Sequence, residues 1–278
     1  SKEEIGCQAL ILACNGYGGN PAMVADHIPE MVRAEYFGHP GNQGDAVNWG
    51  EALGAAAKHM TAYQGHGSVA TPHGILITWA VMMNGGIQVN KLGQRFSNEH
   101  RGYSEQAVDV LAQPDQVAWA ILDDRLLTLG HEFEEFNLAE AAGAVRHAKD
   151  VEDLSKIIDV PMAALQKTLA ETTAHAKGET TDTFGRDFTT QPALSPPYYA
   201  IRVTGALFHT QGGLNIDPQA RVLRPDGSAL PNLYAGGGAA CGLSGSQVWG
   251  YLSGNGLLTA VNLGRIAGQT ATKFIKEG

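Results

Sequence analysis

The amino-acid sequence predicts an α/β protein that carries a second, inserted domain. A short apolar run at residues 9–13 leads into a glycine-containing turn, and a helical pattern begins near Pro21. This order of strand, glycine turn and helix is typical of α/β folds. Residues 61–210 have a different pattern of predicted elements, with short strands followed by helices. Their number is ordinary for a domain. We therefore expect one domain formed by 1–60 and 211–278, with a domain inserted between these parts.

Composition and charge narrow the possible classes of protein. The chain has 278 residues, of which 44% are hydrophobic, and this apolar content is enough for a large core. The formal net charge is -9 and no run of Lys and Arg occurs. Because nucleic-acid surfaces need clustered cations, we expect no nucleic-acid partner.

The chain also lacks the sequence patterns of a membrane or secreted protein. No apolar stretch approaches the roughly 20 residues that span a bilayer, and the first residues show no signal-peptide pattern. We expect a cytoplasmic protein with no integral membrane segment. The cysteines Cys7, Cys14 and Cys241 are too few and too scattered for a disulfide scaffold or a zinc site. We expect all three to be buried thiols.

The first elements follow from apolar spacing and turn residues. Residues 9–13 are expected to form a buried strand, and a helix should follow Asn20 because Pro21 suits a helix start. The turn around Gly44 should lead into a second helix. Its expected apolar positions are Ala52, Leu53, Ala56 and Ala57.

The middle of the chain reads as short strands followed by helices. Residues 75–77 and 87–89 resemble strands, and the second should form a hairpin whose return carries Arg95 and Phe96. Polar, threonine-rich residues 177–197 should form a connector before strands resume at Tyr198. Helices are expected at 104–112, 115–122 and 150–176.

A dense glycine block near the C-terminus offers a candidate ligand site. Residues 233–235 should form a short strand that stops at Gly236, and residues 257–267 should form a helix. A helix that begins in glycines presents free N–H groups and the positive end of its dipole to an oxygen. The alternative is an ordinary glycine-rich turn before a core helix.

Two other patterns, a GxGxxG-like match and a histidine repeat, do not predict a nucleotide-binding or a metal site. Residues 65–70 fit the loose GxGxxG form, but no strand precedes them and Pro72 stands where a helix should begin. His59, His66 and His73 recur every seven residues. The glycines and the proline between them prevent one helix from aligning the imidazoles, so we expect no metal site.

Several segments together form a recognisable series. Residues 13–20 read ACNGYGGN, residues 43–46 read QGDA, and residues 87–99 read IQVNKLGQRFSNE. The later segments are PYYA at 197–200, HTQGG at 209–213, LYAGG at 233–237, SGNGL at 253–257 and GRIAG at 264–268. In this order, and over nearly the whole chain, the series resembles the FAD-dependent fumarate reductase and 3-ketosteroid dehydrogenase superfamily.

The resemblance implies FAD as cofactor and an incomplete Rossmann-like FAD-binding domain with an inserted α+β capping domain. The family's GxGxxG segment, which holds the ADP half of FAD, has no counterpart here, so we expect a fragment or a site completed by another chain. Weak retention of FAD by this chain alone is expected. The implied cofactor-binding residues are Asn15, Gly16, Gly44, Asp45, Gly237, Gly238, Ser253, Gly254, Asn255 and Leu257.

The resemblance also implies a catalytic set. His209 takes the place of a family histidine that binds the substrate carbonyl or carboxylate, and a structural histidine is its alternative. Tyr103 and Tyr251 stand where fumarate reductases have arginines, and tyrosines at both places resemble the ketosteroid dehydrogenase branch. There, one tyrosine assists proton transfer and the other hydrogen-bonds the ketone. The implied substrate-binding residues are His66, Trp79 and Ser253.

Three functions therefore stay open from the sequence. The first is a flavin-dependent oxidoreductase that dehydrogenates or reduces a carbon–carbon bond beside a carbonyl, on a ketone-like, steroid-type substrate. The second is a reductase of an unsaturated carboxylate such as fumarate or urocanate, with Arg101 recruited. The third is a non-catalytic fragment or subunit. The partners expected are a small-molecule substrate and an electron-transfer partner.

Overall fold

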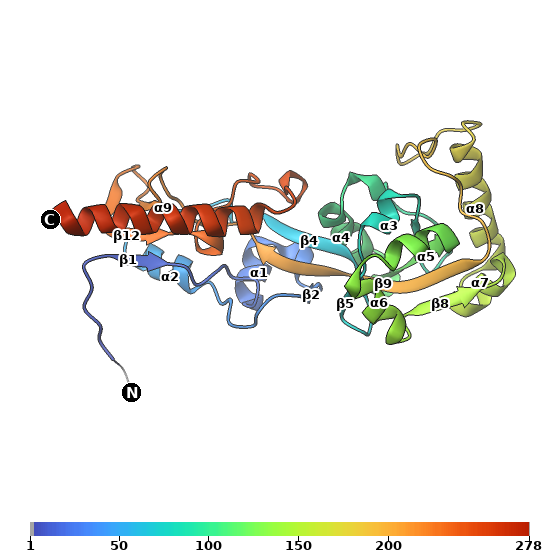
Figure 1. Ribbon diagram of the computed structural model, residues 1–278, viewed down its shortest axis with the longest axis horizontal. Helices are drawn as coiled ribbons and strands as arrows, with labels where there is room; N and C mark the ends of the chain where they lie inside the picture. The colour runs from blue at the N-terminus through green and yellow to red at the C-terminus, as the bar shows by residue number, and fades with distance from the viewer. Residues whose placement is uncertain (1–2, 278) are drawn as a thin grey trace. The chain divides into compact units, whose positions relative to one another are not determined.

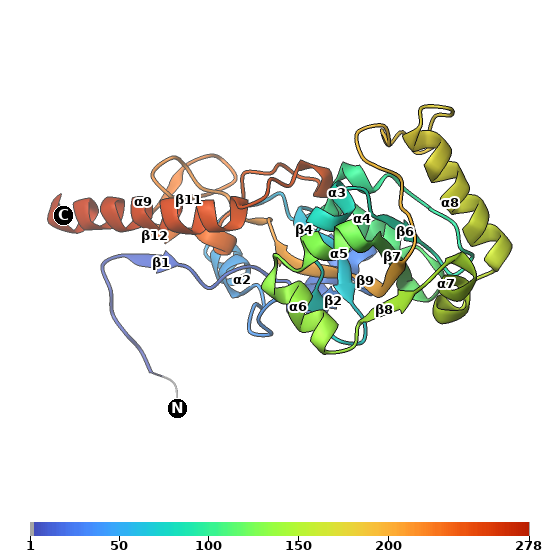
Figure 2. The same cartoon turned by 45° about the vertical axis from the view of Figure 1, so that its right-hand side comes forward.

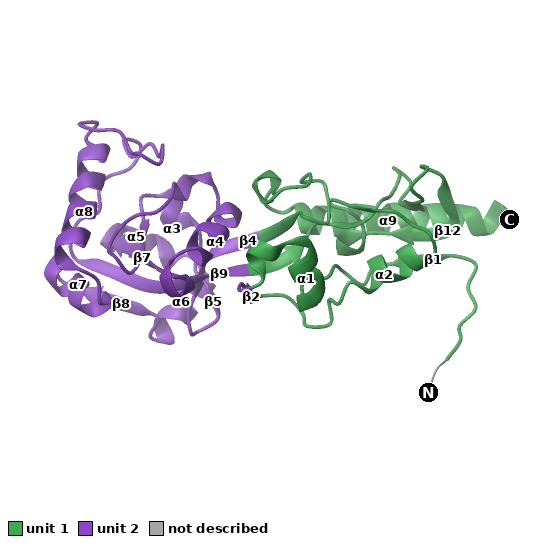
Figure 3. Ribbon diagram, turned by 180° about the vertical axis from the view of Figure 1, so that it is seen from behind, with its two compact units in different colours: residues 1–32, 36–64, 207–278 green, residues 33–35, 65–206 purple. Residues whose placement is uncertain are grey.

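The computed structural model describes residues 3–277 of the chain (Figures 1 and 2). These residues divide into two compact units, which are coloured separately in Figure 3. Unit 1 contains Ser1–Val32, Tyr36–Gln64 and Leu207–Gly278, and unit 2 contains Arg33–Glu35 and Gly65–Ala206. Two of the boundaries fall within the strands β4 (Tyr63–Ala70) and β9 (Tyr198–Thr210).

The sheet of unit 1 combines both ends of the chain. Strand β1 (Leu10–Leu12) pairs in parallel with β12 (Ala229–Ala235), and β11 (Arg221–Leu223) pairs with β12 in antiparallel orientation. The long C-terminal helix α9 (Asn255–Glu277) runs along β12 in Figures 1 and 2, and it buries Ala267 and Ala271 there. Parallel pairing with a covering helix is the packing expected of an α/β unit.

Helix α1 (Pro21–His27) begins where the sequence predicts it. Asn20 is its N-cap, because the Asn20 side chain accepts from the backbone N–H groups of Ala22 (3.1 Å) and Met23 (3.2 Å). Proline follows at the first helical position, where its missing N–H leaves no donor unpaired.

Helix α2 (Asp45–Ala52) is shorter than the sequence spacing predicts. It follows Gly44, which adopts a left-handed conformation with φ of 83°. The expected continuation through Ala57 is wrong, because β3 (Ala57–Lys58) pairs with β10 (Gly213–Leu214) instead. Backbone pairing with a distant strand overrides the helical spacing of the alanines.

The larger sheet belongs to the middle of the chain. Its strand order is β5-β4-β9-β7-β6, and β2 and β8 also pair with β9. One face packs on α3, α4, α5 and α6, and the other face packs on α7 and α8. The bounds of its remaining strands are β2 (Glu35–Tyr36), β5 (Ile75–Leu76), β6 (Ile87–Val89), β7 (Val117–Asp123) and β8 (Val145–Ala148). The helices are α3 (Ala80–Met83), α4 (Tyr103–Leu111), α5 (Asp124–Gly130), α6 (Glu134–Ala141), α7 (Val151–Ile158) and α8 (Met162–Ala176).

Short 3-10 helices occur at turns and helix ends. Those that bear on the site are η2 (Glu99–Arg101), which leads into α4, and η4 (Gly237–Ala239), which follows β12. The others are η1 (Pro29–Met31), η3 (Pro114–Gln116) and η5 (Val248–Gly250). The connector 177–197 has neither helix nor strand, as predicted.

The helix predicted at 115–122 is wrong, and so is the hairpin return. Residues Val117–Asp123 form β7, whose seven residues are all buried in the sheet between β9 and β6. A continuous apolar run of this length suits a buried strand as well as a helix, so periodicity alone misassigned it. Strand β6 pairs with β7, not with Arg95 and Phe96.

The helical pattern at 150–176 is divided into two helices. Helix α7 ends at Ile158, its C-cap Asp159 has a left-handed φ of 53°, and α8 begins after Pro161. Proline disfavours the helical conformation in the residue before it, so the chain breaks there. Helix α9, by contrast, extends ten residues beyond the predicted end at Ala267.

The expectation of buried thiols and of a buried first strand is also wrong. Cys7 and Cys14 are exposed and Cys241 is half-buried. Cys7 lies before β1 and Cys14 lies in the turn after it. In the sheet that the structure describes, β1 is an edge strand beside β12, so both cysteines lie at the edge of this sheet. In β1 itself only Leu12 is buried.

Among residues 3–277, no helix combines the length and apolar character that crossing a membrane requires. In the same residues, no group of three or more His, Cys, Asp or Glu side chains lies close enough to hold a metal ion.

Candidate active site

In unit 1, a buried polar relay joins β9 to the start of α9. The Asn255 amide donates to Gln211 Oε1 (2.9 Å) and also to the Ser244 hydroxyl. Because that bond fixes the orientation of the Gln211 amide, its Nε2 faces His209 Nδ1, 3.0 Å away. Gln211 and Asn255 are both almost fully buried. Through Gln211, the relay therefore connects His209 to two later segments of the chain, at Ser244 and Asn255.

Tyr251 and the first turn of α9 pack against the imidazole of His209. The rings of His209 and Tyr251 meet edge to face, with centroids 5.8 Å apart and an angle of 72°. A Cβ on Gly256 would lie 3.1 Å from His209 Nε2, so glycine there allows the helix to approach the ring. Burial lowers the pKa of His209, which keeps the imidazole neutral.

The two N-terminal glycine turns of unit 1 are tied to each other and to β9. Gly44 N–H donates to the carbonyl of Gly16 (3.0 Å), and Tyr17 N–H donates to Thr210 Oγ1 (3.2 Å). A Cβ on Gly16 would collide with Thr210 Oγ1, and one on Gly238 would collide with the side chain of Asn15. These predicted residues lie side by side although they come from both ends of the chain.

The residues that open α9 present unfilled polar and apolar groups. Asn255 Oδ1 is buried and has no hydrogen-bond donor among the described residues. Gly254 has a φ of 81° and nothing within 4 Å of its Cβ position, and Ser253 is exposed. Leu257 is 78% exposed, although it starts a helix that packs on the sheet. Such a combination fits a ligand that has both polar and apolar parts.

Unit 2 holds a cluster of three aromatic side chains that the sequence analysis assigned to substrate or catalysis. His66 on β4 stacks on Tyr103, with ring centroids 4.9 Å apart and an interplanar angle of 20°. Trp79 meets His66 edge to face at 5.7 Å. The Trp79 indole N–H is buried and finds no acceptor in residues 3–277.

His66 is a neutral group in this cluster. Burial lowers its pKa to about 3, and its Nδ1 accepts from the backbone N–H of Ser68 (3.2 Å). Since Nδ1 accepts, the neutral ring carries its proton on Nε2. The cluster therefore offers uncharged hydrogen-bonding groups and aromatic faces.

The glycines beside His66 serve packing. Gly65 and Gly67 lie within β4, and a Cβ on either would come within 2.8 Å of α4, at Ala107 or Gln106. The helix thus lies directly on the strand, and this brings Tyr103 over His66. The GxGxxG-like match at 65–70 lies within strand β4, which the sequence analysis did not predict.

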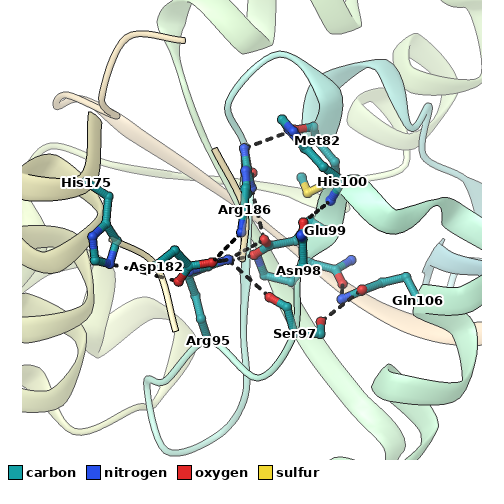
Figure 4. Close-up of polar contacts among 12 residues, drawn as sticks. Met82, Arg95, Ser97, Asn98, Glu99, His100, Gln106, His175, Asp182 and Arg186 are labelled. Carbon is teal, nitrogen blue, oxygen red and sulfur yellow. Dashed lines mark hydrogen bonds and ion pairs between the residues drawn. The ribbon is translucent and has the colours of Figure 1, made fainter. Parts of the chain in front are cut away.

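Two sets of charged side chains in unit 2 form ion pairs. Arg101 forms an ion pair with Asp109 and its side chain is 52% exposed. Arg95, Glu99, Asp182 and Arg186 form a buried network (Figure 4). The sequence analysis did not find this network, because its members are up to 91 residues apart in the sequence.

The predicted residues thus form two groups, one in each unit. Unit 1 brings together His209, Tyr251 and Asn255, and unit 2 brings together His66, Trp79 and Tyr103. Sequence reasoning missed Gln211 and Ser244 as members of the relay. Gln211 could have been found from its place in the HTQGG segment, whereas nothing in the glycine-rich block marks Ser244.

Comparison with known proteins places this geometry in a family. The sequence model described as FAD binding domain matches residues 1–257. A fumarate reductase (cytochrome) from Shewanella frigidimarina is 31% identical over 270 residues, which are 97% of this chain and 46% of that protein. The chain therefore spans less than half the length of this curated relative.

Solved structures agree with the sequence match. The open conformation of a flavocytochrome c3 fumarate reductase matches with a TM-score of 0.75 and 30% identity, over 97% of this chain and 47% of that chain. The 3-ketosteroid-Δ4-(5α)-dehydrogenase of Rhodococcus jostii RHA1, in complex with 4-androstene-3,17-dione, matches with a TM-score of 0.69 and 25% identity. That match covers 95% of this chain and 52% of the dehydrogenase.

Proposed function

Because this chain belongs to the FAD binding domain family, we propose that it forms part of a flavin-dependent oxidoreductase. The proposed reaction dehydrogenates, or in reverse reduces, a carbon–carbon bond next to a carbonyl of a ketone-like substrate. Unit 1 would bind FAD and unit 2 would be the substrate-capping domain. The observation that carries the substrate class is the uncharged aromatic cluster of His66, Trp79 and Tyr103.

The start of α9 fits FAD by three observations. Gly254 leaves open space at a left-handed turn, the buried Asn255 Oδ1 lacks a donor, and Leu257 offers an exposed apolar surface for a planar ring. The first N–H groups of a helix lack intrahelical partners and suit anionic or carbonyl oxygens. We propose that FAD is held by the glycine turns and the helix start, at Asn15, Gly16, Gly44, Asp45, Gly237, Gly238, Ser253, Gly254, Asn255 and Leu257.

The chain's own side chains would supply polarisation and proton transfer. When bound, FAD supplies the hydride donor or acceptor. The Gln211 amide Nε2 lies 3.0 Å from His209 Nδ1, closer than the Thr210 carbonyl at 3.3 Å. We therefore assign the proton of the neutral imidazole to Nε2, from which it would donate to a carbonyl oxygen. Tyr251, in contact with His209, would donate to the same oxygen and increase the acidity of the adjacent C–H.

Tyr103 would move the proton. In the reducing direction its phenol would donate a proton to the substrate carbon, and in the oxidising direction its phenolate would accept that proton. The unpaired indole N–H of Trp79 and the aromatic faces beside Tyr103 would bind an uncharged ring that carries a polar group.

Removing the two hydroxyls tests this mechanism. In the holoenzyme, Tyr103→Phe and Tyr251→Phe should each lower the rate of flavin reduction by a saturated ketone about 100-fold, because general acid–base and oxyanion groups contribute on this scale. Stopped-flow absorbance of the flavin measures the rate. Tyr199→Phe is the matched control, because the Tyr199 hydroxyl donates to Asp124 and its ring lies beside His147, which are outside both groups of predicted site residues. Near wild-type rates in both variants would contradict the mechanism.

A second candidate is the reduction of an unsaturated carboxylate. It is favoured by the 31% identity with a fumarate reductase. It would need a cation for the carboxylate, and Arg101 is the residue that the sequence suggests. Arg101 is instead paired with Asp109 and half exposed, which makes the ketone the first candidate.

A further inference from the structure

The connector 177–197 carries one deeply buried cation, Arg186. It is 4% exposed, and its guanidinium lies over the ring of Phe188, 4.3 Å from the centroid. Its Nη1 donates to the carbonyl of Gly86 (2.8 Å) and to Glu99 Oε2 (3.0 Å), and its Nη2 donates to the carbonyl of Met82 (3.3 Å). Figure 4 shows Arg186 reaching from the connector to both Glu99 and Met82.

Glu99 is the common partner in this network. Its buried carboxylate pairs with Arg95 (2.7 Å) and Arg186, and it accepts from the backbone N–H of Gln88 (3.1 Å). The two arginines hold the pKa of Glu99 below its usual value although burial opposes this. Asp182, bonded to Arg95 (2.8 Å), balances the second positive charge. The two positive and two negative charges balance, and among the described residues Arg186 Nε is the one nitrogen of its guanidinium without an acceptor. A charge-balanced network can be kept in a buried place, whereas an uncompensated charge would be costly there.

Two contacts lead from the network to the segments that bear Trp79 and Tyr103. The Met82 carbonyl, in the short helix that follows Trp79, receives both Arg186 Nη2 and His100 Nε2 (3.2 Å). His100 and Glu99 belong to η2, which ends two residues before Tyr103. The guanidinium therefore contacts both segments directly.

A second series of hydrogen bonds begins at Ser97, two residues before Glu99, and leads to the strand that carries His66. The Ser97 hydroxyl donates to Gln106 Oε1 (2.9 Å) on α4, and Gln106 Nε2 donates to Gln88 Oε1 (2.9 Å). Gln88 Nε2 then donates to the carbonyl of Gly67 (2.8 Å), next to His66. The buried network and the residues bonded to it thus support the segments that carry all three members of the aromatic cluster.

We propose that Arg186 is a positioning residue that fixes Tyr103 for proton transfer, acting through Glu99 and the Met82 carbonyl. Arg186 does not belong to the aromatic cluster itself, and this assignment rests on the proposed role of Tyr103. The geometry needs arginine, because one planar fork serves two carbonyls and a carboxylate. A lysine keeps the charge but has a single nitrogen for the three acceptors.

The test compares Arg186→Lys with Arg146→Lys in the holoenzyme. Arg146 is an exposed residue of unit 2 that donates to the Ile157 carbonyl and lies over Trp119, so its exchange should leave the rate unchanged. Arg186→Lys should lower kcat about tenfold or more with little change in KM, because small misplacements of a reacting group have effects of this order. In the Tyr103→Phe background, Arg186→Lys should reduce the remaining rate less than about twofold, since both changes affect one step. An equal loss in both backgrounds would show a merely structural role and overturn the proposal.

A readout without turnover separates this proposal from the function on which it rests. With 3-fluorotyrosine at position 103, the fluorine resonance should shift or broaden in Arg186→Lys, because the ring moves relative to His66, and should stay unchanged in Arg146→Lys. An unchanged resonance in Arg186→Lys overturns the positioning role, whatever the rates are. A full rate in Tyr103→Phe together with a shifted resonance overturns the proposed function and leaves the positioning intact.

A second variant covers the case in which Arg186→Lys fails to fold. The double variant Glu99→Gln with Arg186→Met removes both charges of the pair, which is tolerated better than one unpaired buried charge. It should show the shifted resonance and a loss of kcat at least as large as that expected for Arg186→Lys. A wild-type resonance and rate in the double variant would overturn the proposal.

Discussion

Two pairs of glycines, one pair from each unit, have opposite surroundings. In unit 2, Gly67 and Gly205 lie in strands beneath α4, where a Cβ would come within 2.7 Å of backbone atoms of the helix. In unit 1, Gly254 and Gly268 have nothing within 4 Å of the Cβ position. Glycine density in the sequence therefore has two meanings, close packing of a helix on a sheet and open backbone at a turn or helix.

This difference distinguishes the aromatic cluster of unit 2 from the turn at Gly254, which precedes α9 in unit 1. In unit 2, the missing Cβ atoms bring α4 and Tyr103 onto β4, so the aromatic cluster depends on packing. In unit 1, Gly254 leaves space in front of α9, where the proposed cofactor residues lie. A methyl group added to each kind of glycine should therefore have different consequences.

The largest effect is expected for Gly205→Ala. Its Cβ would lie 2.5 Å from the carbonyl oxygen of Ala107 and 2.7 Å from Leu111, so α4 must shift away from the sheet. We expect a loss of about 3 kcal/mol in the free energy of unfolding, which is the range of overpacked cores. Urea unfolding followed by circular dichroism measures it.

Gly268→Ala in α9 is the matched control. With open space at its Cβ position, the same change should stabilise the helix by about 0.5–1 kcal/mol, because alanine favours helix over glycine. Equal effects of the two changes would remove the distinction between packed and open glycines.

An intermediate effect is expected from the buried His66. Its pKa of about 3 in the folded protein lies below the value of about 6.5 for an exposed histidine. As the pH falls below about 6.5, the unfolded chain takes up a proton that the folded chain refuses, so stability falls until the pH reaches about 3. Between about pH 7 and about pH 5 this amounts to about 2 kcal/mol.

Replacing the histidine isolates its share of the pH dependence. In His66→Phe, the free energy of unfolding should fall less over the same pH interval, whereas the exposed His147→Gln should behave like the wild type. Urea unfolding at several pH values measures both slopes. The same slope in His66→Phe and wild type would show that His66 does not stay neutral in the folded protein.

Local signals in the sequence predicted the elements that depend on local chemistry. Asn20 and Pro21 set the start of α1, Gly44 sets the start of α2, and the polar connector carries no element. Strand β7 was mistaken for a helix, because a fully buried apolar run has no period that distinguishes the two. The family motifs located His209 and Tyr251, which the structure brings into contact.

The supports of the site could not be predicted, because they depend on contacts between distant segments. Glu99 and Arg186 are separated by 87 residues, and Arg186 lies in a stretch whose composition suggests only a solvated loop. Ser244 joins the relay of Asn255 only after the glycine-rich block has folded over Gln211. Such pairings follow from tertiary packing and leave no local pattern.

The central claim is that the substrate is a ketone rather than an unsaturated carboxylate. Its most direct test offers one substrate of each class to the enzyme. The holoenzyme is mixed without oxygen, in separate experiments, with a saturated 3-ketosteroid while the flavin is oxidised and with fumarate while the flavin is reduced. We predict that the ketone bleaches the visible flavin band and that fumarate leaves the reduced flavin unchanged. Rapid reoxidation by fumarate with no response to the ketone would contradict the account.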